Sequence, residues 1–451
     1  MRINFLEARR FFRNHSGGDI AVFLSFLGLG ITFGFAIHDA TYSEAHTTSG
    51  LLILLGRFSG LLGTYLVLIS LIVIARVPWI EKSVGFDRLV LLHRKLGPIS
   101  FTLITIHVVA ISLGYSLADS KGLMTEIASI ITTYSWMYAA LTAYLLFVVI
   151  ALSSANRIRR SLRYESWWKM HLISYLAVAL SLMHQLLTGS LFIFNETARI
   201  WWMMLYGYAA FTLVLWRFLV PIVRSFKHKL HVDHVVIEGN SAVSIYIRGR
   251  NLKGMHARGG SFFEWRFLSK SLWGQAHPYS LSAAPTDDML RITVKNLGDH
   301  SSALAYLKVG TRVVAEGPYG VFNAKRSYGK RVVLIAGGVG VAPIRAVLED
   351  FTSDTEIDLI YRVVTEEELI LKKEIEFLVL GKDARIHYLI GDPTKFSMSS
   401  QELLKLVPHM AEADVYLCGP PGLARIVRHS VEAIGVPSNK FHHEVFCFGP
   451  N

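Results

Sequence analysis

Cysteine is nearly absent from the sequence. Only two cysteines, Cys418 and Cys447, occur among 451 residues, and both lie in the C-terminal half. Two cysteines exclude a disulfide framework, and their spacing excludes a CxxC pair of metal ligands. So little cysteine suits a protein whose C-terminal half faces a reducing compartment such as the cytosol.

Charged residues are missing from long stretches of the N-terminal half. Up to about residue 225 the sequence contains long uncharged runs, whereas from Phe226 onward charged residues, Gly and Pro are mixed as in a soluble domain. Hydrophobic residues make up 52% of the chain, which favours a membrane protein. We therefore place the boundary between a membrane half and a soluble half near Phe226.

Six apolar runs are long enough to cross a bilayer, which takes about 20 residues of helix. They cover residues 19–38, 51–76, 96–117, 134–154, 168–188 and 200–223. The first run follows a cluster of arginines and could also be a signal peptide, but the segment FAIHDA is a poor cleavage site. We therefore interpret it as a span, and the sequence predicts six transmembrane helices.

Basic residues gather at alternate ends of these spans. They precede the first span, separate the second from the third and the fourth from the fifth, and follow the sixth. The other three loops hold almost none, with Lys121 and Arg199 as the main exceptions. By the positive-inside rule, both termini and the soluble half are expected in the cytoplasm. The same clusters account for the net charge of +12, so we do not expect nucleic acid as a partner.

Two of the spans contain paired histidines. The third span holds His93 and His107, and the fifth holds His171 and His184. Both spans start on the cytoplasmic side, which places one histidine of each at an inner level and the other at an outer level about 20 Å away. Facing histidines at two depths are typical of two bis-histidine b-type haems. The alternative for each histidine is a hydrogen bond to a backbone carbonyl or a place in a polar seam.

The spacing of these histidines differs between the two spans. The 14 residues from His93 to His107 bring both within about 40° of one helix face, whereas the 13 residues from His171 to His184 leave about 140° between them. The fifth helix is therefore expected to be bent or rewound, or the rings and haems to be turned.

Arg57 lies near the outer end of the second span. An unpaired arginine in a bilayer costs about 2.5 to 3.5 kcal/mol on insertion scales. One interpretation is that its side chain reaches the outer surface. The other is that it pairs with the propionates of the outer haem or attracts an anion such as superoxide.

The soluble half has the pattern of two domains. Residues 231–249 alternate around a Gly-Asn turn and predict a β-hairpin, and further short strands predict a small antiparallel barrel to about residue 324. An apolar strand then runs into Gly337, Gly338 and Gly340, before a helix from about Pro343. Glycines at such a junction let a backbone approach a pyrophosphate. Later strands complete an alternating α/β pattern.

Four motifs carry a resemblance to known proteins. HPYSLS (277–282), GGVGVAP (337–343), CGPPG (418–422) and HHEVFCF (442–448) resemble the FAD and NAD(P)H domains of the ferredoxin reductase superfamily. With the two histidine spans, the chain resembles the NADPH oxidase and ferric reductase family of transmembrane haem proteins from about residue 51 onward. The resemblance implies a six-helix transmembrane bundle (1–225), an antiparallel β-barrel FAD domain (226–325) and an α/β NAD(P)H domain (326–451).

The resemblance also implies roles for the flavin motif. Tyr279 would pack on the flavin, Ser280 would lie near its reactive nitrogen, and His277 replaces the arginine that more often contacts the flavin phosphates. The full implied FAD-binding set is His277, Pro278, Tyr279, Ser280, Ser282, Gly298, Ser301 and Ser302. Helix capping is the alternative role for the serines.

Further residues are implied for the nicotinamide cofactor. Gly337, Gly338 and Gly340 match the dinucleotide loop, and Cys418, Gly419 and Pro420 match the segment beside the nicotinamide. Phe446 or Phe448 resembles the aromatic residue that covers the flavin, with a place in the core as the alternative. Arg362 follows a strand where an acidic residue would select NAD, which favours NADPH, with NADH as the alternative.

These features together predict an enzyme of the cell membrane. It would oxidise cytosolic NAD(P)H and pass electrons through FAD and two haems b to an acceptor outside the cytoplasm, either oxygen, giving superoxide, or a ferric chelate. Arg57, Ser280 and Phe446 are the candidate catalytic residues. The alternatives are an electron donor to a periplasmic partner protein, which the short outer loops do not indicate, and a redox sensor.

Overall fold

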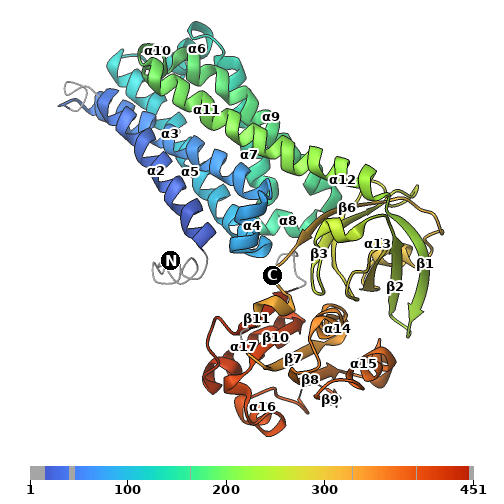
Figure 1. Ribbon diagram of the computed structural model, residues 1–451. Coiled ribbons are helices and arrows are strands. Elements are labelled where there is room, and N and C mark those ends of the chain that lie inside the picture. The colour runs from blue at the N-terminus through green and yellow to red at the C-terminus, as the bar shows by residue number, and fades with distance from the viewer. Residues whose placement is uncertain (1–15, 40–45, 163, 328, 393, 446–451) are drawn as a thin grey trace. The chain divides into compact units, whose positions relative to one another are not determined.

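The computed structural model describes residues 16–39, 46–162, 164–327, 329–392 and 394–445. The chain forms two compact units that divide between Phe218 and Leu219 (Figure 1). Within the described residues, six helices are long and apolar enough to cross a membrane, which confirms the six predicted spans. They are Gly17–His38, Thr48–Ile74, Arg88–Ala118, Met137–Ser154, Ser166–Thr188 and Glu196–His228.

The membrane unit is helical because an apolar layer offers no water to unpaired backbone groups. Its long helices are α2 (Ser16–Asp39), α3 (Thr48–Ile74), α5 (Phe86–Ala118), α7 (Met137–Ser154), α9 (Tyr164–Thr188) and α11 (Glu196–Thr212). Short helices α4 (Pro78–Val84), α6 (Leu123–Thr133), α8 (Asn156–Ser161) and α10 (Ser190–Phe194) connect them. The last span continues from α11 through a π-helical segment, η2 (Leu213–Leu219), into α12 (Val220–His228).

Helix α5 begins earlier than the apolar run predicted, at Phe86 rather than near residue 96. Hydropathy marks only the part of a helix that lies in the lipid, whereas backbone hydrogen bonds continue through the basic residues before it. The side chain of Thr47 caps α3 by accepting from the N–H of Gly50, and Asn195 caps α11 by accepting from Ala198.

Glycines bring α3 and α5 close together. A Cβ atom added at Gly56 would lie 2.7 Å from the side chain of Ile111, and one at Gly114 would lie 2.7 Å from Ile53. Small residues are the usual means of close helix packing in membranes, because there van der Waals contact rather than water drives association. Helix α9 packs along α7, whereas α5 and α9 have few close backbone approaches in the described residues.

The soluble unit begins with a small antiparallel barrel, as predicted. Two three-stranded sheets have the orders β1-β2-β5 and β4-β3-β6. The strands are β1 (His231–Glu238), β2 (Ala242–Arg248), β3 (Phe262–Phe267), β4 (His277–Ser280), β5 (Met289–Lys295) and β6 (Val313–Tyr319), with η3 (Leu252–Met255) and α13 (Asp299–Leu304) between them. Single bridges from Leu281 to Ile292 and from His231 to Arg312 connect the sheets. The barrel encloses fully buried residues such as Ile245, Phe263 and Trp265.

A five-stranded parallel sheet follows, in the order β11-β10-β7-β8-β9. Its strands are β7 (Arg331–Gly337), β8 (Glu356–Val363), β9 (Ala384–Ile390), β10 (Asp414–Gly419) and β11 (Phe441–Val445). Helices α14 (Val341–Asp350), α15 (Lys372–Val379), α16 (Ser400–Leu406) and α17 (Pro421–Ile434), with short turns η4 (Ala324–Arg326), η5 (Gly338–Gly340), η6 (Glu366–Glu368) and η7 (Met410–Glu412), complete it. The strand order reverses between β7 and β10, and such a switch point is where α/β sheets bind ligands.

Candidate functional site

The predicted dinucleotide loop lies at this switch point. Gly337 ends β7 and Gly419 ends β10, and a Cβ atom added at Gly337 would lie 2.9 Å from Pro420 and 3.3 Å from the Cα of Gly419. A Cβ atom at Gly340 would lie 2.2 Å from the carbonyl oxygen of Cys418. The GGVG and CGPP segments therefore pass each other at a distance that only glycine permits, at the carboxyl edge of the sheet, where Gly338 is half-buried and Pro420 is exposed.

Arg362 joins this edge from the neighbouring strand. The parallel register places it opposite Gly337. Its Nε atom is buried without a hydrogen-bond partner. The guanidinium also interacts electrostatically with Asp392. An unsatisfied buried donor beside a dinucleotide loop fits an anionic group of the ligand.

The flavin motif forms β4 and the turn after it. The indole Nε1 of Trp265 donates to the carbonyl of Tyr279 at 2.8 Å, which fixes the strand against the barrel core. The Tyr279 hydroxyl and the Nδ1 of His300 are 3.2 Å apart. Burial raises the pKa of Tyr279, so its hydroxyl stays protonated and can donate.

His300 is a residue that sequence reasoning missed. Its ring lies 3.7 Å from the ring of His277 between centroids, and its Nε2 is buried without a hydrogen-bond partner. Burial, followed by the charge of His277, lowers the pKa of His300 to about 4. An unsatisfied ring nitrogen beside His277 fits an acidic ligand group here. The only signal in the sequence was the position of His300 between Gly298 and Ser301, and any polar loop residue could occupy that position.

The serines of the flavin region have different surroundings. Ser301 caps α13, because its Oγ accepts from the backbone N–H groups of Leu297 and Gly298 at 2.8 and 3.0 Å. Ser302 donates to the Asn296 side chain at 2.6 Å. Ser280 is buried at the end of β4. Ser282 is fully buried, and its hydroxyl belongs to the polar network of Arg291.

In the membrane unit, α5 and α9 bring the inner histidines together. The ring centroids of His93 and His171 are 5.8 Å apart, with the ring planes at 82°. The Nδ1 of His93 lies 2.7 Å from the Ser70 hydroxyl on α3, and the His171 ring stacks on Trp167. The Nδ1 of His171 is buried without a hydrogen-bond partner.

The outer histidines also lie near each other. His107 donates from Nδ1 to the carbonyl of Gly56 at 2.8 Å, which leaves the lone pair of Nε2 available to a metal. A Cβ atom at Gly60 would lie 2.6 Å from this ring, so the glycine makes room for it. His184 is close enough to His107 for the two rings to interact electrostatically. Its Nδ1 faces the Ser181 backbone but makes no hydrogen bond of normal geometry.

Helix α9 is α-helical throughout Tyr164–Thr188, so rewinding does not account for its 13-residue histidine spacing. Next to His184, the side-chain carbonyl of Gln185 accepts from the Trp202 indole at 2.7 Å and from the Tyr206 hydroxyl at 3.3 Å. These bonds attach the outer half of α9 to α11. They restrict the rotation of α9 about its axis and thereby the direction of His184.

The structure says less about the remaining predicted site residues. Arg57 is half-buried in α3, and its side chain interacts with other residues. Phe446 and Phe448 lie outside the described residues. Among the residues that the structure describes, no group of three or more His, Cys, Asp or Glu side chains could hold a metal ion. A haem iron needs only two protein ligands, because the porphyrin supplies the others.

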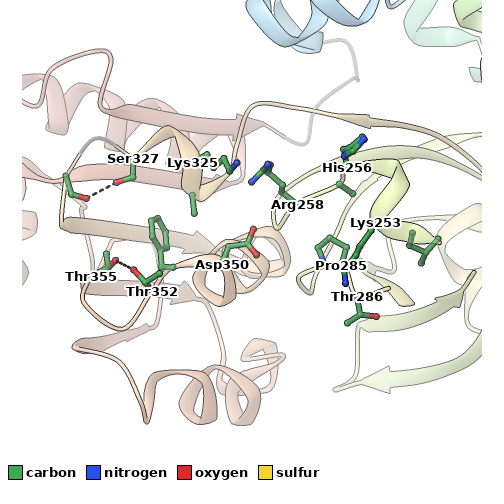
Figure 2. Close-up of a pocket in the computed structure, with 15 residues that line it drawn as sticks. Lys253, His256, Arg258, Pro285, Thr286, Lys325, Ser327, Asp350, Thr352 and Thr355 are labelled. Atoms are coloured by element: carbon green, nitrogen blue, oxygen red, sulfur yellow. Dashed lines mark hydrogen bonds between the residues drawn. The ribbon is translucent and has the colours of Figure 1, made fainter. Parts of the chain in front are cut away.

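A cavity of about 610 Å³ occurs elsewhere in the soluble unit (Figure 2). Lys253, Arg258 and Lys325 line it together with Asp350. It borders residues that precede β7 and β8, at the edge of the sheet opposite the dinucleotide loop. It contains none of the predicted site residues, so it is not the nicotinamide site.

Three protein-family models match successive parts of the chain. The ferric reductase like transmembrane component matches residues 59–182, an FAD-binding domain matches 229–323, and an oxidoreductase NAD-binding domain matches 334–429. The order and extent of the three matches decide the family. The chain belongs to the NADPH oxidase and ferric reductase family. As a member of this family, it has the domains of an NAD(P)H-dependent flavin oxidoreductase and six candidate membrane spans, and the family implies a small-molecule acceptor.

Individual relatives of this ferric reductase family member match about a third of the chain. NADH-cytochrome b5 reductase 1 of Candida glabrata is 29% identical over 38% of this chain and 69% of that protein. The same-named protein of Aspergillus terreus is 30% identical over 34% of this chain and 58% of that protein. For most of the curated relatives that it matches, the chain thus spans little more than half of their length.

Solved structures resemble the same half. The cytochrome P450 reductase GcoB of Amycolatopsis shows a TM-score of 0.41 and 20% identity over 49% of this chain and 69% of that chain. The cytochrome b5 reductase domain of Ulva prolifera nitrate reductase shows a TM-score of 0.41 and 22% identity over 49% of this chain and 98% of that chain.

Because the two loops pass each other so closely, one methyl group added at Gly340 should disturb the binding of the dinucleotide. Gly340→Ala should weaken NAD(P)H binding about tenfold or more, or about 1.4 kcal/mol, because its Cβ would push the dinucleotide loop away from Cys418. Titration of the purified protein with NADPH measures this. Gly422→Ala is the matched control, because no atom lies within 4 Å of its added Cβ. Equal affinities of the two variants would contradict the prediction.

Proposed function

We propose that this protein carries electrons from cytosolic NADPH through FAD and two b-type haems to oxygen or a ferric chelate on the other side of the cell membrane. The single observation that carries the proposal is the arrangement of four histidines in two facing pairs on α5 and α9. When bound, FAD would exchange a hydride for single electrons, and each haem iron would take one electron at a time.

The histidines fit two haems. An imidazole nitrogen binds a metal at about 2.0 to 2.1 Å, so two rings that share one metal hold their facing nitrogens about 4 Å apart. The ring centroids of such a pair lie further apart than the two facing nitrogens, and the 5.8 Å between the ring centroids of His93 and His171 agrees with this. Both histidines of α5 have their Nδ1 atoms engaged by α3, as metal-binding histidines usually do through the nitrogen that does not bind. His93 and His171 would hold the inner haem, and His107 and His184 the outer one.

The domain limits follow the same division. The haem-binding bundle comprises residues 1–225, the FAD barrel residues 226–325 and the NAD(P)H domain residues 326–451. Both termini and the flavin domain face the cytoplasm, in accord with the basic loops. Arg57 acts at the outer haem, either on its propionates or on an approaching anion.

The soluble residues would hold the other two cofactors. Tyr279 and Ser280 would hold the flavin ring, and His277 and His300 would bind the flavin phosphates. Gly337, Gly338 and Gly340 would admit the pyrophosphate of the nicotinamide cofactor, and the Cys418 segment would hold the nicotinamide. The buried, unsatisfied Nε of Arg362 beside Gly337 supports a 2′-phosphate, and hence NADPH.

The ligand assignment predicts a partial loss of haem. His107→Ala should remove about half of the haem measured as the pyridine haemochrome, because one of two ligand pairs is lost. Reduction of a soluble dye by NADPH should continue, since it needs only the flavin domain. His38→Ala, an exposed histidine at the end of α2, is the control and should keep all the haem. Unchanged haem in His107→Ala would refute the assignment.

The acceptor is tested on purified protein in detergent. NADPH consumption with oxygen alone, with superoxide formed, is the outcome expected of an oxidase, and consumption stimulated by ferric citrate is expected of a reductase. Consumption with neither acceptor, in protein that still reduces a soluble dye, would contradict a small-molecule acceptor of these two kinds and would point to a protein partner.

The role of Arg362 predicts a selective loss. Arg362→Ala should raise the KM for NADPH about tenfold and leave that for NADH nearly unchanged, because only NADPH carries the 2′-phosphate. Lys395→Ala removes an exposed basic residue of the same domain and serves as the control. Equal losses for both nucleotides in Arg362→Ala would contradict a role in binding the 2′-phosphate.

A further inference from the structure

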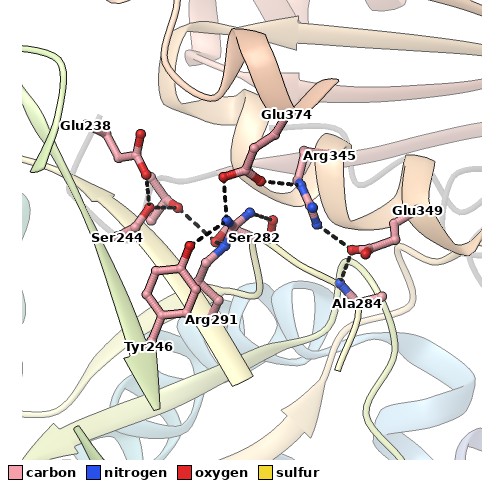
Figure 3. A network of polar contacts seen from close by, with 10 residues as sticks. Glu238, Ser244, Tyr246, Ser282, Ala284, Arg291, Arg345, Glu349 and Glu374 are labelled. Atoms are coloured by element: carbon pink, nitrogen blue, oxygen red, sulfur yellow. Dashed lines mark hydrogen bonds and ion pairs between the residues drawn. The ribbon is translucent and has the colours of Figure 1, made fainter. Parts of the chain in front are cut away.

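A closed ring of polar contacts joins the FAD barrel to the nucleotide-binding domain (Figure 3). We call it the interdomain clamp. Two helices of the nucleotide-binding domain, α14 and α15, contribute acidic and basic side chains, and the barrel contributes β5 and the segment after β4. Its members are Ser282, Ala284, Arg291, Arg345, Glu349 and Glu374.

Arg291 is the barrel's part of the clamp. Only 4% of its side chain is exposed. Its Nε donates to the Ser282 hydroxyl at 3.0 Å, and one terminal nitrogen donates to the Ser282 carbonyl at 2.7 Å. The other terminal nitrogen donates to Glu374 on α15 at 2.8 Å and to the Tyr246 hydroxyl at 3.1 Å. Its donors are thus directed to the flavin segment, to Tyr246 of the barrel and to the nucleotide-binding domain.

Glu374 carries the contact onward. Its second carboxylate oxygen lies 3.0 Å from the Nε of Arg345 on α14, and Arg345 pairs in turn with Glu349 one helical turn later. Glu349 accepts a hydrogen bond at 2.7 Å from the backbone N–H of Ala284. The ring therefore returns to the barrel two residues after Ser282, where it began.

The two ends of the clamp adjoin the two halves of the cofactor chemistry. Ser282 ends the flavin motif HPYSLS and Ala284 lies two residues after it, while α14 directly follows the glycine loop of the nicotinamide site. A shift of one domain against the other would stretch at least two charged hydrogen bonds. Such bonds are stronger than neutral ones and restrict geometry.

The charges of the clamp balance within it. Two arginines face two glutamates, and the loss of either glutamate is costly because arginine side chains that are only 4% and 10% exposed stay buried and uncompensated. Burial is the largest influence on the Glu374 carboxyl and acts to raise its pKa, but Arg291 and Arg345 together hold that pKa below its usual value. Glu374 is therefore ionised at neutral pH and binds both arginines.

We propose that the interdomain clamp sets the distance between the nicotinamide and the flavin, and that Glu374 and Arg345 are positioning residues for hydride transfer. This inference rests on the proposed path from NADPH to FAD. The reaction moves one hydride, a proton with two electrons, from the nicotinamide ring to the flavin ring. It needs the reacting atoms about 3 to 3.5 Å apart, and a misplacement of about 1 Å can cost about a hundredfold in rate.

The test is Glu374→Gln, which keeps the shape and removes the charge. The limiting rate of flavin reduction at saturating NADPH, followed by stopped-flow absorbance, should fall about tenfold or more. The dissociation constant for NADPH should change less than about threefold, because the dinucleotide loop is untouched. FAD content should stay that of the wild type.

Glu356→Gln is a closely matched control. The Glu356 side chain is 32% exposed and lies 2.8 and 3.0 Å from Arg331 and Arg385, whereas Glu374 is 35% exposed and lies 2.8 and 3.0 Å from its two arginines. The partners of Glu356, Arg331 and Arg385, belong to the parallel sheet and are 40% and 60% exposed, so this variant loses ion pairs of the same lengths without affecting the clamp. Its limiting rate should equal that of the wild type.

A second measurement does not depend on turnover. Hydrogen exchange in the full-length protein should rise for the peptide that contains Ala284 in Glu374→Gln and stay unchanged in Glu356→Gln. Arg345→Lys keeps the positive charge but lacks the planar guanidinium group with its several donors. Its limiting rate of flavin reduction should lie between those of the wild type and Glu374→Gln. An unaltered limiting rate together with unaltered exchange at Ala284 overturns the clamp alone. If NADPH fails to reduce the flavin of the wild-type protein, the proposed electron path is overturned as well.

Discussion

Each histidine inside an apolar helix has two ring nitrogens that need a partner. In each histidine pair, the packing of α3 against α5 gives a partner to one nitrogen of the histidine on α5. The carbonyl of Gly56 takes the Nδ1 proton of His107, and the Ser70 hydroxyl lies against the Nδ1 of His93. The contact of His107 requires the two helices to approach as closely as Gly56 and Gly60 permit. The Nε2 atoms are thereby left for another partner, and the proposed haem path depends on them.

The soluble unit adds charged contacts to close glycine packing, since a Cβ atom added at Gly259 of the barrel would lie 2.1 Å from the carbonyl oxygen of Ala346 on α14. The barrel and the parallel sheet each have a hydrophobic core of their own, although Ala242 of β2 belongs to the core of the sheet. The interdomain clamp crosses this boundary with directional bonds and attaches the segment after the flavin motif to the helix after the glycine loop. The same strand reversal that opens the sheet at β7 and β10 places the Cys418 segment against Gly340.

Most of the architecture could be predicted because its signals are local. The six spans follow from hydropathy, the hairpin at 231–249 from alternation, and the strand before Gly337 from an apolar run that ends in glycines. The predicted starts of helices differ from the structure where the sequence pattern has no sharp end. Helix α5 begins at Phe86 because helical hydrogen bonding continues past the lipid boundary, and α14 begins at Val341 rather than near Pro343.

The candidate site was less accessible to such reasoning. His300 carries no pattern of its own, and only folding brings its ring against His277. The spacing of His171 and His184 suggested a bent or rewound helix or turned rings, and α9 is a regular α-helix whose outer half Gln185 attaches to α11. The Arg291 and Glu374 pair joins residues far apart in the chain, which no motif links.

The sequence by itself determined which segments cross the membrane, which segments bind dinucleotides, and which histidines share a helix, because hydropathy, glycine spacing and helical period act over a few neighbouring residues. Only the tertiary structure decided which ring nitrogen is engaged, which loop passes the Cys418 carbonyl, and which charges hold the two soluble domains together. These outcomes depend on the approach of residues that are distant along the chain, and that approach is set by packing rather than by any local preference.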